Sequence, residues 1–286
     1  MHGAALRLSI GLCALSAVAC GERPLEPRDP TPGVPHFRVQ SYNVESSDHD
    51  DPDTIGAVGK NDADVVCLQE TTPDFEAVLQ ERYADQYPYQ LYRHHWPGPA
   101  GLAVLSKFPV EDSGWHAGPN GWHPAWHVIV DTPDGKFQIL NVHLRSKSEG
   151  NGNIVSSYLS SNDDHLYEID LFMQQCNNGL PSIVLGDFNE GLGGVALQYL
   201  EDRGYRNILP LYRPGQHTWR HSSVANQFTQ TLDHILFDTA FEPLNAWVSN
   251  VGGSDHLPVV AHVEAAYDWT PEVKSLRGEA TRREAP

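Results

Sequence analysis

The stretch SIVLGDFNEG, residues 182–191, decides the fold and raises the first question about function. Its first four residues are apolar or small, as in a buried β-strand, and they lead directly into Gly186, Asp187, Phe188 and Asn189. A carboxylate and an amide therefore stand almost side by side where a buried strand ends. Taken alone, such an Asp-x-Asn pair is more typical of a turn that bonds its own backbone than of a catalytic pair.

Other predicted strands also place polar side chains at one end. The segments SYNVES, VVCLQET, ILNVHLRS, TLDHILF and GGSDHLPVV carry, in this order, Asn43, Glu70, His143, Asp233 and the pair Asp255-His256. Each alone has an ordinary structural explanation, such as a turn amide, an acid that caps a helix or a satisfied core histidine. If these strand ends meet at one rim of the sheets, they form an acidic cleft that contains histidine.

Short apolar runs bounded by turn residues alternate with helix-like segments from residue 36 onward. Strands are predicted in FRVQSYNV, DVVCLQE, GLAVLSKFPV, AWHVIVDT, KFQILNVHL, SIVLGD, QTLDHILFD and LPVVAHVEA, and helices in DFEAVLQERY, DDHLYEIDLFMQQC and GVALQYLEDRG. Thr72-Pro73 supplies a helix N-cap and a first-turn proline. The turn PDG predicts a hairpin, which argues against a purely parallel sheet. We expect one mixed α/β (α+β) layered domain over residues 36–268.

Both ends of the chain are predicted to lie outside this domain. Residues 1–19 have a basic start and an apolar run too short to span a bilayer, which is typical of an export signal. LSAVAC resembles a bacterial lipobox, so Cys20 is the predicted lipidation site, with an ordinary secretory peptide cut near Ala19 as the alternative. The lipid would anchor the exported protein to a bacterial membrane, and Gly21 favours the outer membrane, facing the periplasm or the cell surface. Residues 20–35 are expected to form a proline-rich tether, and residues 269–286 a charged tail.

The charge of the mature chain excludes attraction of polyanions by bulk electrostatics. The full chain has 19 Lys and Arg against 37 Asp and Glu, and loss of Arg7 with the signal leaves a net charge of −19. Chemistry on phosphate must therefore be local, with a metal ion expected to invert the sign of the potential. Cys67 and Cys176 remain after processing, and their apolar surroundings favour free thiols over a disulfide.

The predicted strands carry a series of short motifs: LQE, NVHL, GDFN, LDHI and SDHLPV. By the order of these motifs and their matching strand contexts, the sequence resembles the endonuclease/exonuclease/phosphatase superfamily, which includes deoxyribonuclease I. The resemblance runs from about residue 39 to residue 262. It implies a four-layer α/β sandwich, in which two packed mixed β-sheets are flanked by helices. It also implies a metal-dependent phosphoesterase that uses in-line attack of water on phosphorus. The chain has no Gly-x-Ser-x-Gly elbow, His-Glu-x-x-His or Walker loop that would indicate another chemistry.

The resemblance implies a metal site and a phosphate site. Glu70 matches the principal metal-ligating carboxylate, with Asn43 and Asp255 as further metal-site residues. An all-oxygen site suits Mg²⁺, with Mn²⁺ or Ca²⁺ as alternatives. The residues expected to bind phosphate are Asn43, Asn189, His143 and, from its place just after His143, Arg145.

The catalytic residues implied by the resemblance are His143, Asp187, Asn189, Asp233 and His256. Asp187 matches the residue that orients or activates the attacking water. Asp233 would hold the His256 imidazole in one orientation and stabilise its protonated form. Two roles stay open: His256 is either a general base or a donor to the phosphoryl oxygen, and His143 either donates to the phosphate or protonates the leaving oxygen. Asp255 is either a metal ligand or a second acid that orients histidine.

The leading hypothesis for the substrate is nucleic acid, which makes the protein a nuclease or another phosphodiesterase. The rival enzyme is a phosphatase or phospholipase C that acts on lipid headgroups or sugar phosphates, for which a membrane anchor is a natural setting. The rival from another class is a catalytically inactive surface binding module. The sequence leaves the oligomeric state open.

Three further features have competing interpretations. Histidine and tryptophan are dense between residues 94 and 127, which fits a wall that stacks on a base or sugar, a second metal site, or an aromatic-rich hairpin. The acidic run SSDHDDPD, residues 46–53, fits either a structural Ca²⁺ site or a solvated loop, and because it lacks EF-hand spacing a solvated loop is expected. Thr218 and Arg220, shortly before Asp233, are candidate phosphate contacts.

Overall fold

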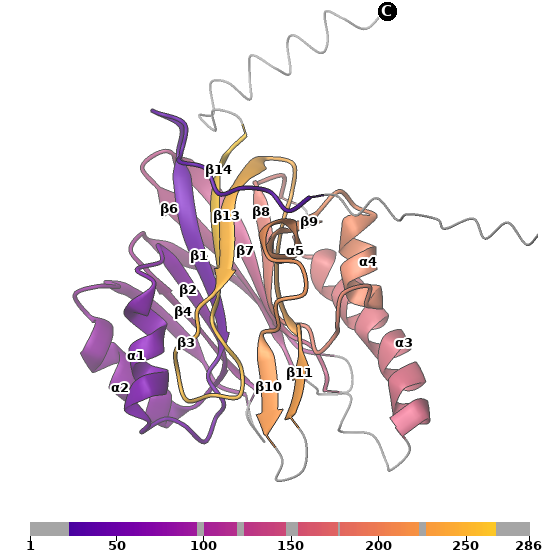
Figure 1. Cartoon of the computed structure of the whole chain (residues 1–286). Coiled ribbons are helices and arrows are strands. Elements are labelled where there is room, and N and C mark those ends of the chain that lie inside the picture. The colour runs from indigo at the N-terminus through magenta and orange to yellow at the C-terminus, as the bar shows by residue number, and fades with distance from the viewer. Residues whose placement is uncertain are drawn as a thin grey trace, which may run out of the picture.

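A computed structural model describes residues 23–95, 100–118, 123–146, 154–176, 178–222 and 227–266 (Figure 1). The predicted signal, the predicted lipidation site Cys20 and the predicted charged tail lie outside the described residues. Strands from residue 36 to residue 265 form two six-stranded sheets and a small two-stranded one. This arrangement confirms the predicted sandwich of two mixed sheets.

The first sheet has the strand order β13 (Phe241–Val248), β14 (Val259–Ala265), β1 (His36–Asn43), β2 (Val65–Thr71), β4 (Gly101–Ser106) and β3 (Tyr89–Arg93). The second has the order β5 (Val110–His116), β6 (Ala125–Thr132), β7 (Gly135–His143), β8 (Ser182–Asp187), β12 (Asp233–Phe237) and β9 (Arg206–Asn207). The pairs β1/β2 and β7/β8 are parallel, and the other named pairs are antiparallel. The small sheet pairs β10 (Trp219–Ser222) with β11 (Gln227–Gln230).

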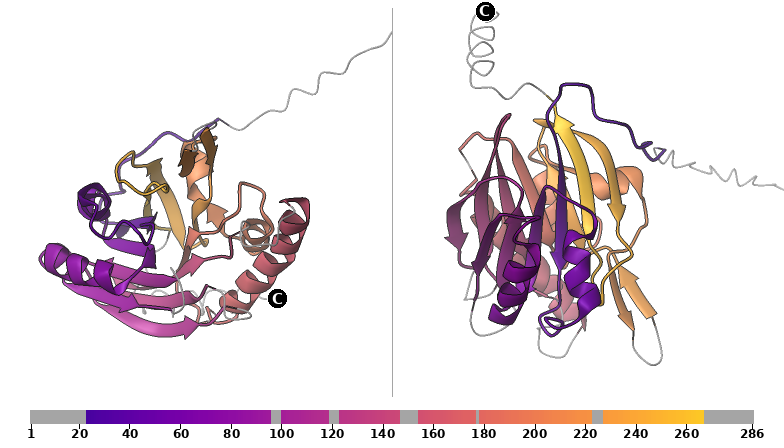
Figure 2. Two further views of the ribbon diagram at one scale, coloured as in Figure 1. Left: turned by 90° about the horizontal axis from the view of Figure 1, so that it is seen from below. Right: turned by 90° about the vertical axis from the view of Figure 1, so that its left-hand side faces the viewer.

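Helices cover the outer face of each large sheet (Figure 2). Buried residues of α1 (Pro52–Lys60) and α2 (Pro73–Tyr83) pack on the first sheet, and those of α3 (Ile154–Met173) and α4 (Val195–Glu201) pack on the second. The short helix α5 (Ile208–Tyr212) contributes to the core between the sheets. Burial of apolar side chains in three layers supplies the main driving force for this fold.

Several local predictions are confirmed. Thr72 caps α2 by accepting a hydrogen bond from the Phe75 amide at 3.3 Å, and the PDG turn joins β6 to β7. Cys67 lies in the core between the sheets and Cys176 beside the α3–α4 cluster, and both thiols are free.

The acidic run of residues 46–53 is not only a solvated loop. Asp51 caps α1 by accepting a hydrogen bond from the Thr54 amide at 2.7 Å, and Pro52 occupies the first helical turn. The run contains an Asp-Pro pair, which is typical of a helix start. This helix was not predicted because α1 is short and contains few apolar residues.

The segment of residues 23–35 differs from the predicted tether. It is extended, but it lies against the domain at the upper end of the sheets in Figure 1. Leu25 donates its amide to the Leu211 carbonyl at 2.7 Å, and Arg28 donates its amide to the Leu244 carbonyl at 3.0 Å. Proline content predicts extension but carries no information on a distant partner. Among the described residues, no helix has the length and apolarity needed to cross a membrane.

Candidate active site

Strand register alone brings three predicted residues together in the second sheet. His143 at the end of β7 pairs with Asp187 at the end of β8, and Asp187 pairs with Asp233 at the start of β12. The first sheet contributes Asn43, whose side-chain amide donates to Glu70 Oε1 at 3.0 Å and to Asp187 Oδ2 at 3.1 Å. The buried Asn43 amide therefore joins a carboxylate of the first sheet to one of the second. We call this edge of the two sheets the rim, and it carries Asn43, Glu70, His143, Asp187, Asp233 and His256.

The backbone of the opening stretch explains why a buried strand ends in these side chains. Gly186 has φ +145, and a Cβ there would lie 1.9 Å from the Val142 carbonyl oxygen, so β8 can approach β7 only with glycine. Asn189 has φ +50, a conformation that asparagine tolerates, and its amide hydrogen bonds Asp187 Oδ1 at 2.8 Å. Phe188 is fully buried between them and fixes the turn in the outer core.

Glu70 is aimed at the rim by an irregularity in β2. The register with β4 shifts between Gln69 and Thr71, and Glu70 between them has φ +62, which is uncommon for a non-glycine residue. Such bulges re-aim a side chain next to active sites. Glu70 Oε2 also accepts the Ser46 amide at 3.3 Å, and the side chain is 21% exposed.

The predicted Asp233–His256 pair is formed. His256 Nδ1 lies 2.8 Å from Asp233 Oδ2, and His256 Nε2 lies 3.6 Å from Asp187 Oδ2. Thr218, one of the candidate phosphate contacts, instead donates its hydroxyl to Asp233 Oδ2 at 2.6 Å and accepts the Leu232 and Asp233 amides at 3.0 Å. It therefore supports the carboxylate that orients the imidazole.

Burial and neighbouring charges give these groups distinct protonation states. Burial raises the pKa of Asp187 to about 7, with Asp233 adding to the increase and His256 opposing it. Burial opposes the charged form of His256, but Asp233 and Asp187 outweigh it and raise its pKa to about 10. For His143, burial, His123 and His256 all lower the pKa well below its usual value, so this imidazole is neutral at pH 7.

His123 also lies in the site, although the sequence did not predict it as a site residue. Its ring lies 4.0 Å from the His143 ring, centroid to centroid, at an interplanar angle of 32°. Both imidazoles are buried, and His143 Nε2 lies 3.6 Å from Asp187 Oδ2. The local histidine density marked this region, but no sequence spacing identifies which histidine contacts His143.

The rim offers carboxylate oxygens for a divalent metal ion, but not every residue that was predicted to bind the ion presents an oxygen to it. Glu70 and Asp187 offer hard carboxylate oxygens on either side of one amide, and burial raises the pKa of Asp187 despite the nearby His256 imidazole. Asn43 donates to both carboxylates with its nitrogen, while its oxygen accepts the Glu45 amide at 3.1 Å. In this arrangement Asn43 positions the two carboxylates rather than presenting a ligand oxygen.

A second set of groups has metal-like spacing. Among the described residues, ligand atoms of Asp187, Asp233 and His256 lie within 4.8 Å of one another. A metal ligand must be a neutral imidazole, whereas His256 is held protonated between two carboxylates. This set has the geometry of an imidazolium between two carboxylates, and Glu70 stays the candidate metal-binding carboxylate of the rim.

The remaining predicted residues lie at the border of the site. Asp255 Oδ2 accepts the Trp219 indole N–H at 2.8 Å, and Asp255 Oδ1 lies 3.9 Å from His256 Nε2, which favours its histidine-orienting role. Arg145 donates to Asp164 of α3 at 2.8 Å, so its guanidinium makes a structural ion pair in this structure. Arg220 donates to Asn250 Oδ1 at 3.3 Å.

The aromatic region is only partly described, because Trp96 and Trp122 lie outside the described residues. Trp126 is 1% exposed and donates its indole N–H to Asp112 at 2.9 Å, so it is a core residue and not a stacking surface. His127 bonds Gln138 at 2.8 Å. Within the part of the chain that the structure describes, this region contributes no group with metal-ligand spacing.

Behind the rim, a buried network ties the active-site loops to α3. His165 Nδ1 lies 2.9 Å from Glu190 Oε1, and its Nε2 lies 2.6 Å from the Arg145 carbonyl oxygen. Glu190 follows Asn189, so this contact joins the loop after β8 to the loop after β7. Glu168 Oε2 accepts the Arg145 amide at 3.3 Å, and burial raises the Glu168 pKa to about 7.

Glu168→Gln should stabilise the protein at alkaline pH. Because the folded-state pKa of Glu168 is above its unfolded value of 4.5, wild type loses stability from this group as pH rises from about 4.5 to about 7. Glutamine keeps an acceptor for the Arg145 amide and removes the cost, so we expect a gain of about 1–3 kcal/mol at about pH 8 and little change at about pH 4.5. Urea denaturation at both pH values measures this, with exposed Glu111→Gln as the control. An equal effect of Glu168→Gln at both pH values would contradict the assignment.

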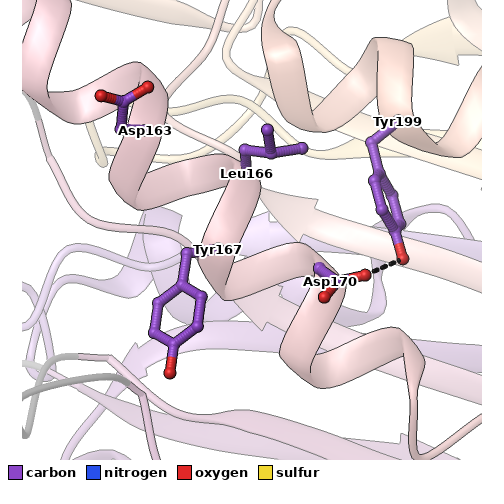
Figure 3. A pocket seen from close by; sticks show the side chains of 5 residues that line it. All are labelled: Asp163, Leu166, Tyr167, Asp170 and Tyr199. Carbon is purple, nitrogen blue, oxygen red and sulfur yellow. Dashed lines mark hydrogen bonds between the residues drawn. The ribbon is translucent and has the colours of Figure 1, made fainter.

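A separate hollow of about 380 Å³ lies on the outer surface, between α3 and α4 (Figure 3). Tyr199 donates its hydroxyl to Asp170 at 2.7 Å across this hollow. Its lining, Asp163, Leu166, Tyr167, Asp170 and Tyr199, shares no residue with the rim.

The two packed mixed sheets and the polar side chains at their rim agree with the comparison with known families. The model of the endonuclease/exonuclease/phosphatase family matches residues 41–256, a range that includes Asn43, Glu70, His143, Asp187, Asp233 and His256. The chain belongs to this family. Among curated proteins, no sequence matches it significantly.

Solved structures share the fold at low sequence identity. An endonuclease/exonuclease/phosphatase from Beutenbergia cavernae superposes with a TM-score of 0.65 at 20% identity, covering 82% of this chain and 72% of that one. TDP2 from D. rerio, complexed with a single-strand DNA product, gives 0.60 at 16%, covering 80% and 98%. The human Nocturnin catalytic domain with bound sulfate gives 0.58 at 17%, covering 81% and 94%.

Proposed function

We propose that this protein is a Mg²⁺-dependent phosphodiesterase, with nucleic acid as its substrate. The observation that carries the proposal is the meeting of Asn43, Glu70, His143, Asp187, Asp233 and His256 at one rim. A binding module has no need for a neutral histidine, an imidazolium and two carboxylates at hydrogen-bonding range. The structural neighbour bound to a single-strand DNA product supports nucleic acid over other phosphoesters.

The proposed role of each site residue follows from its charge. Asp187, held by the Asn43 and Asn189 amides, orients the attacking water and accepts its proton. His256, fixed by Asp233, donates to a phosphoryl oxygen, and its raised pKa supports this donor role over that of a general base. Neutral His143 donates a ring N–H to the phosphate, and the bond between phosphorus and the leaving oxygen breaks as the bond to the attacking water forms. Glu70 would hold the Mg²⁺ ion, which neutralises charge on the phosphate when it is bound.

We also propose that the protein is exported, lipidated at Cys20 and anchored to a bacterial membrane, with an outer-membrane location preferred. The basic start, the short apolar run and the lipobox-like LSAVAC support this proposal. The anchor would then be joined to the domain through residues 23–35, which pack against it.

A substrate panel tests the proposed function. We expect the chain from residue 23 onward to cleave DNA or RNA in Mg²⁺ and to leave sphingomyelin and sugar phosphates intact. Nucleotide-length products would be resolved by electrophoresis and released headgroup by chromatography. Cleavage of only sphingomyelin would assign the protein to the phospholipase C class, and cleavage of only a sugar phosphate would make it a phosphatase.

A further inference from the structure

The segment of residues 23–35 is bound at the end of the sandwich that lies opposite the catalytic rim. Its amides pair with Leu211 of α5 and Leu244 of β13, as described above. Figure 1 shows this segment crossing the upper end of the sheets, while the loop between β13 and β14, which carries His256, lies at the lower end. The side view in Figure 2 shows the same separation.

One buried acid holds the segment in place. Glu264 of β14 accepts the Arg28 guanidinium at 2.6 Å, the Thr31 amide at 2.7 Å and the Thr31 hydroxyl at 3.1 Å. The Glu264 side chain is 7% exposed and that of Arg28 is 43% exposed, so the acid is shielded from water while the guanidinium stays partly solvated. Pro35 closes the segment by accepting the Ala265 amide at 2.8 Å. A charged group with this many partners makes the segment part of the folded domain.

Chain geometry separates the anchor from the rim. Residues Cys20 to Arg23 are three positions apart, so the chain between them spans at most about 11 Å. From Pro35 the chain enters β1, whose eight residues reach Asn43 in the active site. At about 3.3 Å per residue, β1 places the rim about 25 Å from the docked segment.

We propose, on the basis of the lipid anchor proposed above, that the docked segment orients the domain with its catalytic rim turned away from the membrane. The phosphates of the anchoring bilayer then lie beyond the reach of Glu70 and Asp187. The substrate is therefore a phosphoester dissolved in the surrounding compartment, and not a phospholipid of the same membrane.

Fluorescence quenching on vesicles tests the orientation. The full chain is produced in its lipidated form, its mass establishes the modification of Cys20, and it is inserted into phosphatidylethanolamine/phosphatidylglycerol vesicles that carry headgroup nitroxides. In a Cys176→Ser background, a fluorophore is placed by Thr239→Cys, in the exposed turn after β12, or by Ser47→Cys, in the exposed loop after β1. We expect loss of most of the emission at position 239 and little loss at position 47.

Release of the docked segment supplies the matched comparison. Arg28→Ala combined with Thr31→Ala removes the two side-chain bonds to Glu264 and leaves the bond from the backbone amide of residue 31, so the difference in quenching between the two positions should shrink. Arg23→Ala, in the exposed part of the same segment, should leave the contrast intact. Equal quenching in the wild type, stronger quenching at position 47, or an unmodified Cys20 would overturn the proposal.

An activity measurement on the same vesicles separates this proposal from the proposed function. Hydrolysis of added oligonucleotide with intact vesicle lipid supports both. Hydrolysis of the vesicle phospholipid by its own anchored enzyme overturns the orientation while retaining the enzyme. Quenching contrast without hydrolysis of any ester overturns the proposed function and supports the orientation.

Discussion

His256→Ala should lower the rate of phosphodiester hydrolysis by about 10³-fold or more, because it removes a charged donor and leaves Asp233 without its partner. The imidazole is only 6% exposed and lies between two carboxylates, so no solvent group can replace its charge. Steady-state kinetics with bis-p-nitrophenyl phosphate measure the loss. It should fall on kcat, because the donor acts most strongly on charge that develops in the transition state.

The alanine variant also removes a partner from a buried carboxylate, which costs about 3–5 kcal/mol when a buried ion pair is broken. His256→Asn is therefore the variant that separates chemistry from folding, because its amide can still donate to Asp233 but carries no charge. We expect it to be folded by circular dichroism and still inactive. His36→Ala, an exposed histidine at the opposite end of β1, should retain full activity. Near-wild-type turnover by folded His256→Asn would show that the imidazole is not required.

Glu70→Gln should have the second largest effect, through the metal ion. Glutamine preserves the size of the side chain and removes its negative charge, which is what attracts a hard divalent cation. A metal that stabilises transition-state charge contributes several kcal/mol, so we expect at least about a 10²-fold loss at fixed Mg²⁺. Rates measured across a Mg²⁺ titration should also show saturation at a higher concentration.

Metal binding without catalysis gives a second readout for Glu70. Electron paramagnetic resonance detects free Mn²⁺ in solution. Wild type should bind added Mn²⁺ and lower the signal of the free ion, whereas Glu70→Gln should leave that signal unchanged. Glu111→Gln, which neutralises an exposed acid in β5, is the matched control. Equal Mn²⁺ binding by wild type and Glu70→Gln would move the metal position elsewhere in the rim.

The residues at strand ends could be predicted from the sequence because a local pattern encodes them. A buried strand that ends in Asp187 must present that side chain at a sheet edge, and the parallel pairing of β7 with β8 then places His143 beside it. The same alternation predicted the hairpin of β6 and β7 and the helix that begins after Thr72. These features depend on neighbours in the chain or in one sheet.

The features that were missed depend on distant partners. β13 contains Pro243 beside a register shift, which hides its alternation, and β3 is a partly exposed edge strand with weak apolar content. The contact of His123 with His143 joins the approach to β6 with the end of β7. Arg28 and Glu264 are 236 positions apart in the sequence, and no local sequence pattern predicts their contact.

The most direct test of the account is metal-dependent hydrolysis of bis-p-nitrophenyl phosphate by the chain from residue 23 onward, measured as release of p-nitrophenol. We predict that wild type cleaves this ester in Mg²⁺, stops in EDTA and recovers when Mg²⁺ is restored in excess. Asp187→Asn, which keeps the acceptor for the Asn189 amide, should be inactive in all three conditions. Cleavage that persists in EDTA, or equal cleavage by Asp187→Asn, would contradict a metal-assisted site built on Asp187 and Glu70.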